Sequence, residues 1–565
     1  MKKLLSLLWM FSSMLFLASC GGDDDDDDDM VPGPIITASG STDAEADGAA
    51  VNIDFSVIVA GGYASSTVGV SPSNGSAAVS AEPDAGATTG TVTVSYTPGS
   101  DAGGVTITLT VIDENGISAN QSATVNVTGG TTAATEVEVF NSAEGVGTTT
   151  WTKDNVYVLR GFVFVNDGQV LTIEPGTVIK GQPGQGASAS ALIIARGGQL
   201  VAEGTAVEPI IFTGLADDLA GSVADDANGL WGGLIILGNA GNNANSTNNL
   251  LAIEGLPETE SRGTHGPDAS YPLDDADNSG SLKYVSIRHG GSLIGSDNEI
   301  NGLTLGSVGS GTTIENIEIF ANLDDGVEFF GGSVDVKNMV IGLSGDDGID
   351  IDNGYNGSIQ NAIVWHSGDN LESSDPSGAE MDGATGDDEG ATGTPFATPK
   401  LANITWVFDA GASSLTQALH LRDNFGGSIY NSIIAGHDAG ITIEETSKTS
   451  ASWDLFVDGT IEITNNIIFD VNGASDLAGT VTVNGDPADA ADFGTYIAAN
   501  NTMIDPGFGT GIDRFTPSVA EVTSAALATV STKDVALEDA AYIGAIDPVG
   551  TPFFEGWSLL SSIIQ

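Results

Sequence analysis

The sequence predicts an all-β protein, a right-handed parallel β-helix preceded by a small immunoglobulin-like β-sandwich. Three observations carry this prediction. Short apolar strands recur at nearly constant spacing in the second half of the chain, apolar and polar residues alternate strictly in the first part, and 76 of the 565 residues are glycine. Short strands separated by glycine-rich turns are typical of sandwiches and stacked coils.

The β-helix is predicted from asparagines that each precede an apolar strand. Asn316, Asn338 and Asn361 follow one another at nearly equal steps. A repeat of about 22 residues is typical of stacked coils, whose equivalent strands lie about 4.8 Å apart. The marker recurs after longer, loop-containing steps at Asn403, Asn431 and Asn465. We therefore expect an asparagine ladder, a β-helix over residues 136–557 and a C-terminal tail over 558–565.

The sandwich is predicted from residues 31–128. Segments 51–59, 91–96, 105–111 and 123–127 alternate apolar and polar residues. About a hundred residues with this period-two pattern favour two packed antiparallel sheets. The region has no Cys and no Trp, so we expect a disulfide-free sandwich. Residues 129–135 are glycine- and threonine-rich and predict a linker.

The N-terminus predicts export and lipidation. Two lysines and an apolar run from Leu4 to Leu17 are typical of a signal peptide, here residues 1–19. The Leu-Ala-Ser-Cys sequence that ends at Cys20 resembles a bacterial lipobox, which implies cleavage before Cys20 and its acylation. Residues 20–30 contain seven consecutive aspartates, so we expect an unfolded acidic tether. Such runs resemble the surface-export signal of Bacteroidetes lipoproteins.

Charge and composition restrict the partners. The net charge of −61 opposes binding to nucleic acid, and it opposes polyanionic glycans unless a cation bridges them. Cys20 is the only cysteine, so disulfides are excluded. No later apolar stretch is long enough to span a bilayer. We therefore expect a surface-exposed outer-membrane lipoprotein whose only membrane attachment is lipid.

Several segments resemble a family of Bacteroidetes outer-membrane β-helix lipoproteins. The likeness covers about residues 151–350 and implies fold and location, but no established activity. The segments that carry it are Gly176–Gly181, Leu192–Gly197, Gly229–Leu234, Tyr284–Gly290, Glu299–Leu305 and Asp324–Phe330.

Acidic residues repeat with the period of the coils. Asp324-Asp-Gly-Val-Glu328 is followed one coil length later by Asp346-Asp-Gly-Ile-Asp350, and then by Asp369-Asn-Leu-Glu372. In stacked coils we expect two columns, one of Asp325, Asp347 and Asp369 and one of Glu328, Asp350 and Glu372. Stacked carboxylates repel, and a cation such as Ca²⁺, which prefers several oxygen ligands, would offset the repulsion. The alternative is that turns simply favour Asp and Gly.

A catalytic interpretation comes from a second, local resemblance. Gly345–Asp350 resembles the double-Asp motif of polygalacturonase-type hydrolases, and Asn322–Gly326 resembles their Asn-Thr-Asp motif. This implies paired carboxylates that act as general acid and general base. Three departures weigh against it, because Gly348 stands where Cys is usual, only His437 approximates the expected Gly-His-Gly, and no Arg-Ile-Lys follows. The candidate catalytic residues are Asp324, Asp325, Asp346, Asp347, His420 and Arg422, the last two expected on the face of the second column.

The remaining aromatic and histidine residues receive simpler assignments. Trp365 falls on the outward phase of its strand and is predicted to be a sugar-stacking platform, whereas Trp406 falls on the inward phase and is predicted to be core. His289 and His366 have no metal-ligating partner at useful spacing. We expect both histidines to be structural.

The function predicted from these features is a cell-surface lipoprotein whose β-helix is a binding or structural module, directed to an extracellular polysaccharide and assisted by Ca²⁺. Two alternatives stay open. One is a β-helix glycoside hydrolase that uses paired aspartates, and the other is a structural adhesin stalk. The sequence features together favour a binding or structural protein over an enzyme, and they do not indicate an oligomeric state.

Overall fold

The computed structural model divides the chain into two compact units, Met1–Ala133 and Ala134–Gln565. The predicted signal peptide (1–19) and the acidic tether (20–30) with Cys20 lie outside the described residues. The described residues are 32–564, with gaps at 40–41, 47, 73, 100–101, 129–133, 245–249, 258, 296–297, 374–375, 385–392, 410, 412–416, 446–451, 485–486 and 525–526.

The first unit contains two four-stranded sheets that share one core. Alternation produces the core directly, since Ile53, Phe55 and Val57 of β3 are buried and the residues between them are exposed. The immunoglobulin-like topology itself stays a prediction. One sheet has the order β1 (Ile35–Ala38), β3 (Val51–Ile58), β6 (Thr89–Thr97), β5 (Ser76–Ala81), and the other the order β2 (Thr42–Glu45), β8 (Ser118–Thr128), β7 (Gly103–Asp113), β4 (Tyr63–Ser71).

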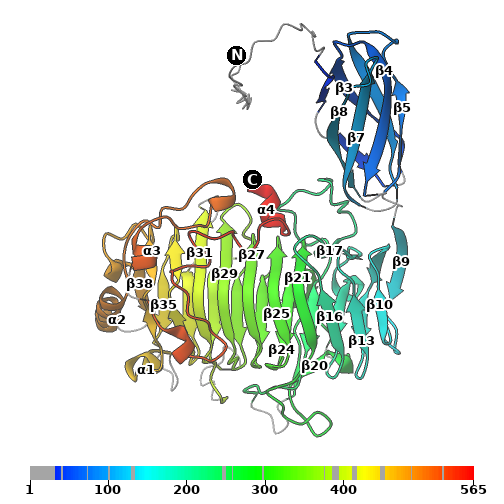
Figure 1. Ribbon diagram of the computed structural model, residues 1–565. Coiled ribbons are helices and arrows are strands. Elements are labelled where there is room, and N and C mark those ends of the chain that lie inside the picture. The colour runs from blue at the N-terminus through cyan, green and yellow to red at the C-terminus, as the bar shows by residue number, and fades with distance from the viewer. Residues whose placement is uncertain are drawn as a thin grey trace. The chain divides into compact units, whose positions relative to one another are not determined.

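The second unit is a stack of coils built from long parallel sheets (Figure 1). One sheet has ten strands, and each strand pairs in parallel with its counterpart in the next coil. In order along the stack these strands are β12 (Phe162–Val165), β15 (Ala191–Ile194), β18 (Leu234–Leu237), β24 (Leu303–Gly306), β26 (Val327–Phe330), β28 (Ile349–Asp352), β30 (Ser377–Asp382), β32 (Gln417–Arg422), β35 (Ile441–Glu444) and β38 (Val481–Asn484).

A second sheet of sixteen strands forms the other sides of the coils. Two short hairpins, β19 (Leu251–Ala252) with β20 (Thr264–His265) and β22 (Leu293–Gly295) with β23 (Asn298–Glu299), project from the loops. The sixteen strands are β9 (Thr135–Phe140), β10 (Thr149–Trp151), β11 (Asn155–Arg160), β13 (Val170–Ile173), β14 (Val178–Gly181), β16 (Gln199–Glu203), β17 (Ile210–Gly214), β21 (Gly280–Arg288), β25 (Thr313–Phe320), β27 (Asp335–Gly342), β29 (Ser358–Ser367), β31 (Lys400–Asp409), β33 (Ser428–Tyr430), β34 (Ile433–Ala435), β36 (Ile463–Thr464) and β37 (Ile467–Phe469).

The core of the stack is continuous because inward positions coincide in register from coil to coil. Val327, Ile349 and Leu419 lie in one inward row of the ten-stranded sheet, and all are fully buried. Trp406 is fully buried in the same core, as predicted. Burial of a Val or Leu side chain contributes about 1.5–3 kcal/mol, so this row fixes which residues face outward.

The predicted asparagine ladder is confirmed for its first three members, whereas Asn403 Nδ2 and Asn431 Nδ2 donate to the C-terminal segment, at Tyr542 O and Ala528 O. Asn338 Nδ2 donates to Asn316 Oδ1 at 3.2 Å, and Asn361 Nδ2 donates to Asn338 Oδ1 at 3.1 Å. All three residues have positive φ, between 54° and 59°. Asparagine tolerates the left-handed region better than other residues that have a Cβ. The repeated Asn therefore serves two purposes, because it makes the sharp backbone turn and joins neighbouring coils.

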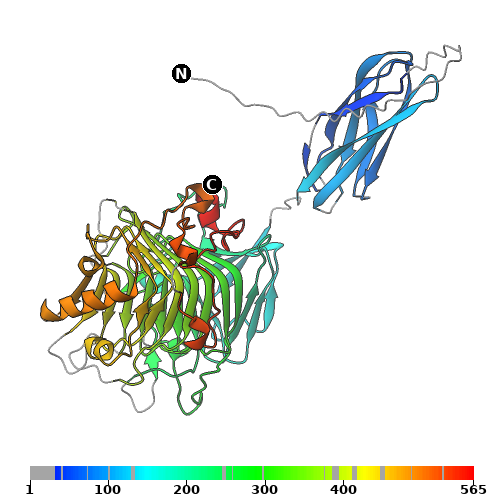
Figure 2. The same cartoon turned by 60° about the vertical axis from the view of Figure 1, so that its left-hand side comes forward.

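The stack ends earlier than the predicted residue 557. Its last strand is β38, and the helices α1 (Ser452–Val457) and α2 (Pro487–Asn500) lie at this end, with Phe493 of α2 buried against Trp453 at the end of the core (Figure 2). Among the described residues, no helix has the length and hydropathy to cross a membrane.

The C-terminal segment, residues 501–564, returns along the sixteen-stranded sheet. It contains α3 (Glu521–Ser524) and α4 (Leu559–Ile563). Residues 558–564 are not a free tail, because Leu559 N and Leu560 N both donate to Glu318 of β25 at 2.8 Å, and Leu560 is fully buried. The last described residues therefore contact a coil near the middle of the stack.

Candidate functional site

A column of polar residues crosses the outward face of the ten-stranded sheet. Glu328 of β26 pairs in register with Asp350 of β28. Asp350 pairs with Glu380 of β30, and Glu380 pairs with His420 of β32. Their neighbours along each strand are buried apolar residues, so period-two alternation turns these four side chains outward. We call Glu328, Asp350 and Glu380 the acid column.

Glu372, predicted in this column, is not part of it. Its position is taken by Glu380, and Glu372 lies in the loop before β30, where its N–H donates to Gly345 O at 2.7 Å. The side chain of Glu372 still borders the same cleft. The predicted pairing of Glu328 with Asp350 is correct.

A second set of carboxylates lies in the turns that lead into these strands. Asp347 N donates to the Asp325 carboxylate at 2.9 Å, and Ser377 N donates to the Asp347 carboxylate. Ser377 therefore takes the third position, which had been predicted for Asp369. Asp369 lies instead in an exposed turn after β29. The step from Asp347 to Ser377 is 30 residues, against 22 from Asp325 to Asp347, and the eight extra residues form this loop.

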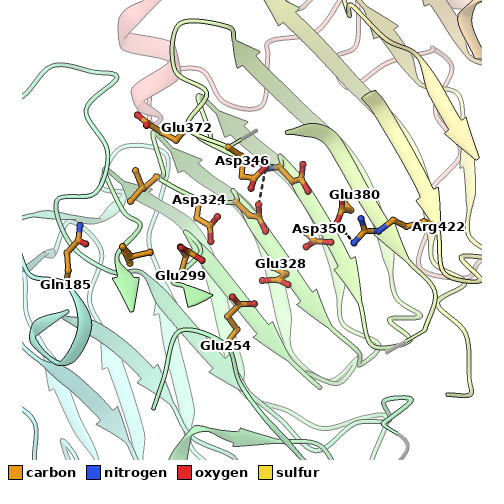
Figure 3. A pocket seen from close by; sticks show the side chains of 15 residues that line it. Gln185, Glu254, Glu299, Asp324, Glu328, Asp346, Asp350, Glu372, Glu380 and Arg422 are labelled. Carbon is orange, nitrogen blue, oxygen red and sulfur yellow. Dashed lines mark hydrogen bonds and ion pairs between the residues drawn. The ribbon is translucent and has the colours of Figure 1, made fainter. Parts of the chain in front are cut away.

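These two sets line one cleft of about 770 Å³, which we call the acid cleft (Figure 3). The acid column is its floor, and the turns with Asp324 and Asp346 form one wall. The opposite wall comes from loops that sequence periodicity did not reveal, and these carry Glu254 and Glu299. The full lining is Gln185, Glu254, Leu293, Glu299, Leu323, Asp324, Asp325, Glu328, Asp346, Asp347, Asp350, Glu372, Ser373, Glu380 and Arg422.

Burial disfavours the charged forms of these carboxyl groups. Loss of solvent, with the nearby charges of Asp346 and Glu299, raises the pKa of Asp324 to about 8. Burial likewise raises the pKa of Glu254 to about 7. For Asp325 and Glu328, which are 7% and 5% exposed, burial first and carboxylate neighbours second raise the pKa well above the usual range.

The arrangement could hold cations in three overlapping triads, in each of which one carboxylate oxygen per residue lies within 4.8 Å of the others. Cations would offset the repulsion described above. Several carboxylate oxygens without imidazole or thiolate ligands suit Ca²⁺ in preference to zinc. The triads are Asp324, Asp325 and Asp346, then Asp325, Glu328 and Asp350, and then Asp347, Asp350 and Glu380.

Arg422, a predicted catalytic candidate, forms ion pairs at one end of the cleft. Its Nη2 lies 2.7 Å from Glu380 Oε1, and its Nε and Nη2 donate to the two oxygens of Asp382 at 2.6 and 2.9 Å. His420 shares the face of the acid column, as predicted, with Nδ1 3.8 Å from Glu380 Oε2. Arg422 is the one basic residue among the described residues that line the cleft.

Trp365 is not an open stacking platform. Its side chain does leave the core, but the C-terminal segment covers it, because Phe515 packs on the ring at a centroid distance of 5.8 Å and the Arg514 guanidinium lies 4.8 Å from the ring centroid. The indole Nε1 donates to Asp409 Oδ2 at 2.8 Å. The prediction failed because strand phase cannot show which side chains a distant segment of the chain covers.

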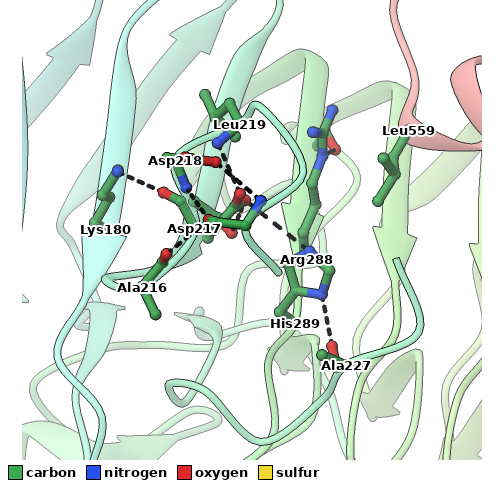
Figure 4. Close-up of polar contacts among 12 residues, drawn as sticks. Lys180, Ala216, Asp217, Asp218, Leu219, Ala227, Arg288, His289 and Leu559 are labelled. Carbon is green, nitrogen blue, oxygen red and sulfur yellow. Dashed lines mark hydrogen bonds and ion pairs between the residues drawn. The ribbon is translucent and has the colours of Figure 1, made fainter. Parts of the chain in front are cut away.

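A separate polar cluster around His289 is structural (Figure 4). The His289 Nδ1 atom is 2.5 Å from the Ala227 carbonyl oxygen, and Nε2 is 4.0 Å from Asp217 Oδ2. Asp217 also accepts hydrogen bonds from Thr213 Oγ1 at 2.7 Å and Leu219 N at 2.8 Å. These contacts secure the loop after β17 and leave the carboxylate occupied.

Comparisons with known proteins agree with this architecture. The sequence model of the pectate-lyase-like β-helix domain matches residues 142–514, about two thirds of the chain. The chain belongs to this family. No curated protein matches its sequence. Among solved structures, this family member is similar to the family 28 exopolygalacturonase of Yersinia enterocolitica, with 10% identity and a TM-score of 0.14 over 81% of this chain and 90% of that one. An identity and a TM-score this low say nothing about the activity of this protein.

Proposed function

We propose that this pectate-lyase-like β-helix protein binds Ca²⁺ in its acid cleft and, through the bound ions, an anionic polysaccharide. The single observation that carries the proposal is the set of three overlapping carboxylate triads along the floor and one wall of the acid cleft. Ten carboxyl groups and one arginine line the cleft, so an anionic chain would be repelled without bridging cations. Pectate, the substrate in the family's name, is a polyanion of this kind.

The cleft is suited to calcium because its ligands are hard carboxylate oxygens held on paired strands of one sheet and on the turns before them. Asp325 and Asp350 each belong to two triads, so one carboxylate could bridge two ions. Binding would also relieve the cost of burying these charges, since an opposite charge favours the ionised form. The affinity for calcium is therefore expected to fall as carboxylates of the cleft are replaced by neutral side chains.

The direct test is calorimetric titration of the full chain, without its predicted signal peptide, with CaCl₂ after chelation and dialysis. Saturable binding that is lost in the triple variant Asp325→Asn, Asp347→Asn, Asp350→Asn is expected. Retention on immobilised polygalacturonate in calcium, but not in chelator or on a neutral glucan, would extend the result to the glycan. No heat of binding and an unchanged triple variant would overturn the proposal.

A glycoside hydrolase is the second candidate, and the pKa of Asp324 near 8 favours it. A carboxyl group that stays protonated at neutral pH can donate a proton to a leaving oxygen, and Asp346 beside it could act as the base. Release of reducing ends from polygalacturonate in the presence of chelator, abolished by both Asp324→Asn and Asp346→Asn, would establish this activity. Binding without release would leave a binding module.

We also propose, from the sequence, that Cys20 is lipidated and anchors the protein at the surface of the outer membrane through the tether 20–30. Signal-peptide cleavage before Cys20 and radiolabelled palmitate incorporation that Cys20→Ala abolishes are the expected results. Protease accessibility on intact cells tests surface exposure. If neither calcium nor glycan binds, and deletion weakens cell adhesion, the alternative of an adhesin stalk is supported instead.

A further inference from the structure

We propose that Arg422 closes the third cation position of the acid cleft, so that the cleft binds two divalent cations and not three. The proposal rests on the cation binding proposed above, and it adds which of the three triads can accept a cation. It concerns the number of ions, which the residue pattern alone does not give.

The three triads form a row. Asp325 is shared by the first and second triads, and Asp350 by the second and third. The two shared residues come from successive coils, and Glu380 comes from the coil after Asp350. Coils are spaced by about 4.8 Å, so neighbouring ions would be bridged by a common carboxylate. Each of the three positions offers carboxylate oxygens from three residues. The positions differ in the other side chains that lie beside them.

The third position already has a positive charge of the protein beside it. Arg422 Nη2 lies 2.7 Å from Oε1 of Glu380, whose carboxylate belongs to this triad. Arg422 cannot swing away freely, because Asp382 holds its guanidinium with two hydrogen bonds, at 2.6 and 2.9 Å. A guanidinium stays charged at all relevant pH values. A divalent ion at this position would therefore compete with Arg422 for the Glu380 carboxylate and meet a fixed positive charge.

The second position has the opposite character. Asn301 is 1% exposed and donates Nδ2 to Glu328, while its buried Oδ1 has no hydrogen-bond partner. A buried acceptor without a partner is costly. An ion beside Glu328 would offer this amide a partner that the protein alone does not supply. The basic residue of the cleft lining, Arg422, holds Glu380 and Asp382 at the far end of the row.

The experiment counts ions. The full chain without its predicted signal peptide is dialysed to equilibrium against calcium, and bound metal is measured by plasma mass spectrometry. Two ions per chain are expected for the parent and three for Arg422→Met, which keeps an unbranched, flexible side chain and removes its charge. The control Arg262→Met removes an arginine that pairs with Glu260 outside the cleft and is expected to leave two.

The outcomes separate the two proposals. A parent that binds no calcium refutes the proposed function, whereas a parent that binds three ions refutes only the role of Arg422. A folded Arg422→Met protein with two ions or fewer also refutes that role. If the single variant does not fold because Asp382 is left unpaired, Arg422→Met with Asp382→Asn keeps the test decisive, and it is expected to bind three ions.

Discussion

Replacement of Asp350 by Asn should stabilise the calcium-free protein and weaken calcium binding. Asp350 belongs to two of the three triads, in which ligand oxygens lie within 4.8 Å of one another. Two charges at that distance repel by about 3.5 kcal/mol at an effective dielectric constant of about 20. Partial protonation already relieves part of this repulsion, so we expect a net gain of about 2 kcal/mol. Asn keeps the volume of the side chain, so packing should change little.

The assay is thermal unfolding in chelator and in calcium, with calorimetric titration alongside. In chelator the melting temperature of Asp350→Asn should rise by about 2–4 °C, whereas calcium affinity should fall by about tenfold or more because a charged ligand of the second position is lost. Asp438→Asn, at an exposed position outside the cleft, should change neither quantity. Most substitutions destabilise proteins, so a lower melting temperature in chelator, or an unchanged affinity, would refute the reasoning.

Three further predictions concern pH, the C-terminal segment and the ladder. The pKa of Glu254 is raised to about 7 and that of Asp324 to about 8, so the folded state holds protons that the unfolded state has released. Without calcium, stability should therefore fall as pH rises from about 6.5 to about 9, and denaturant melts at each pH should show this loss abolished by calcium; a flat profile would contradict it. His265, His366 and His437 oppose this trend only below about pH 6.5, because burial lowers the pKa of each of these three histidines. Glu318→Ala should cost about 3–5 kcal/mol in urea unfolding, because it removes the acceptor of two backbone N–H groups of α4, and a cost below about 1 kcal/mol would show that α4 is held otherwise. Asn338→Ala should cost about 2 kcal/mol and Asn338→Gly less, since Gly keeps the positive φ but not the hydrogen bonds; equal costs would assign the whole effect to the side chain.

Those parts of the site that repeat with the coils were predictable from the sequence. The constant coil length placed Glu328 over Asp350 and Asp325 beside Asp347, because register in a parallel stack follows from equal steps along the chain. The asparagine ladder was predictable for the same reason. The repeat of apolar and polar residues predicts the fold, because the alternation that turns one set of side chains into the core turns the other set outward.

The errors arose where coil length changes or where distant segments meet. The longer step after Asp347 displaced Asp369 from its predicted column. Glu254 belongs to a long insertion without periodicity, so nothing in the sequence tied it to the cleft. Trp365 was predicted to be open because its cover comes from Arg514 and Phe515. Loop length and long-range contacts are not encoded in strand phase.

The contact between α4 and Glu318 affects how the stack can come apart. In a simple solenoid each repeat touches only its neighbours, so unfolding can begin at an end and proceed one repeat at a time. Here Leu559 and Leu560 are hydrogen-bonded to Glu318 of β25, a strand far earlier in the chain. Unfolding that begins at the C-terminal end would first have to break these hydrogen bonds between α4 and β25. The coils between β25 and β38 should therefore unfold together, as one cooperative block, and a nascent chain should gain their full stability only after Leu559 and Leu560 have emerged.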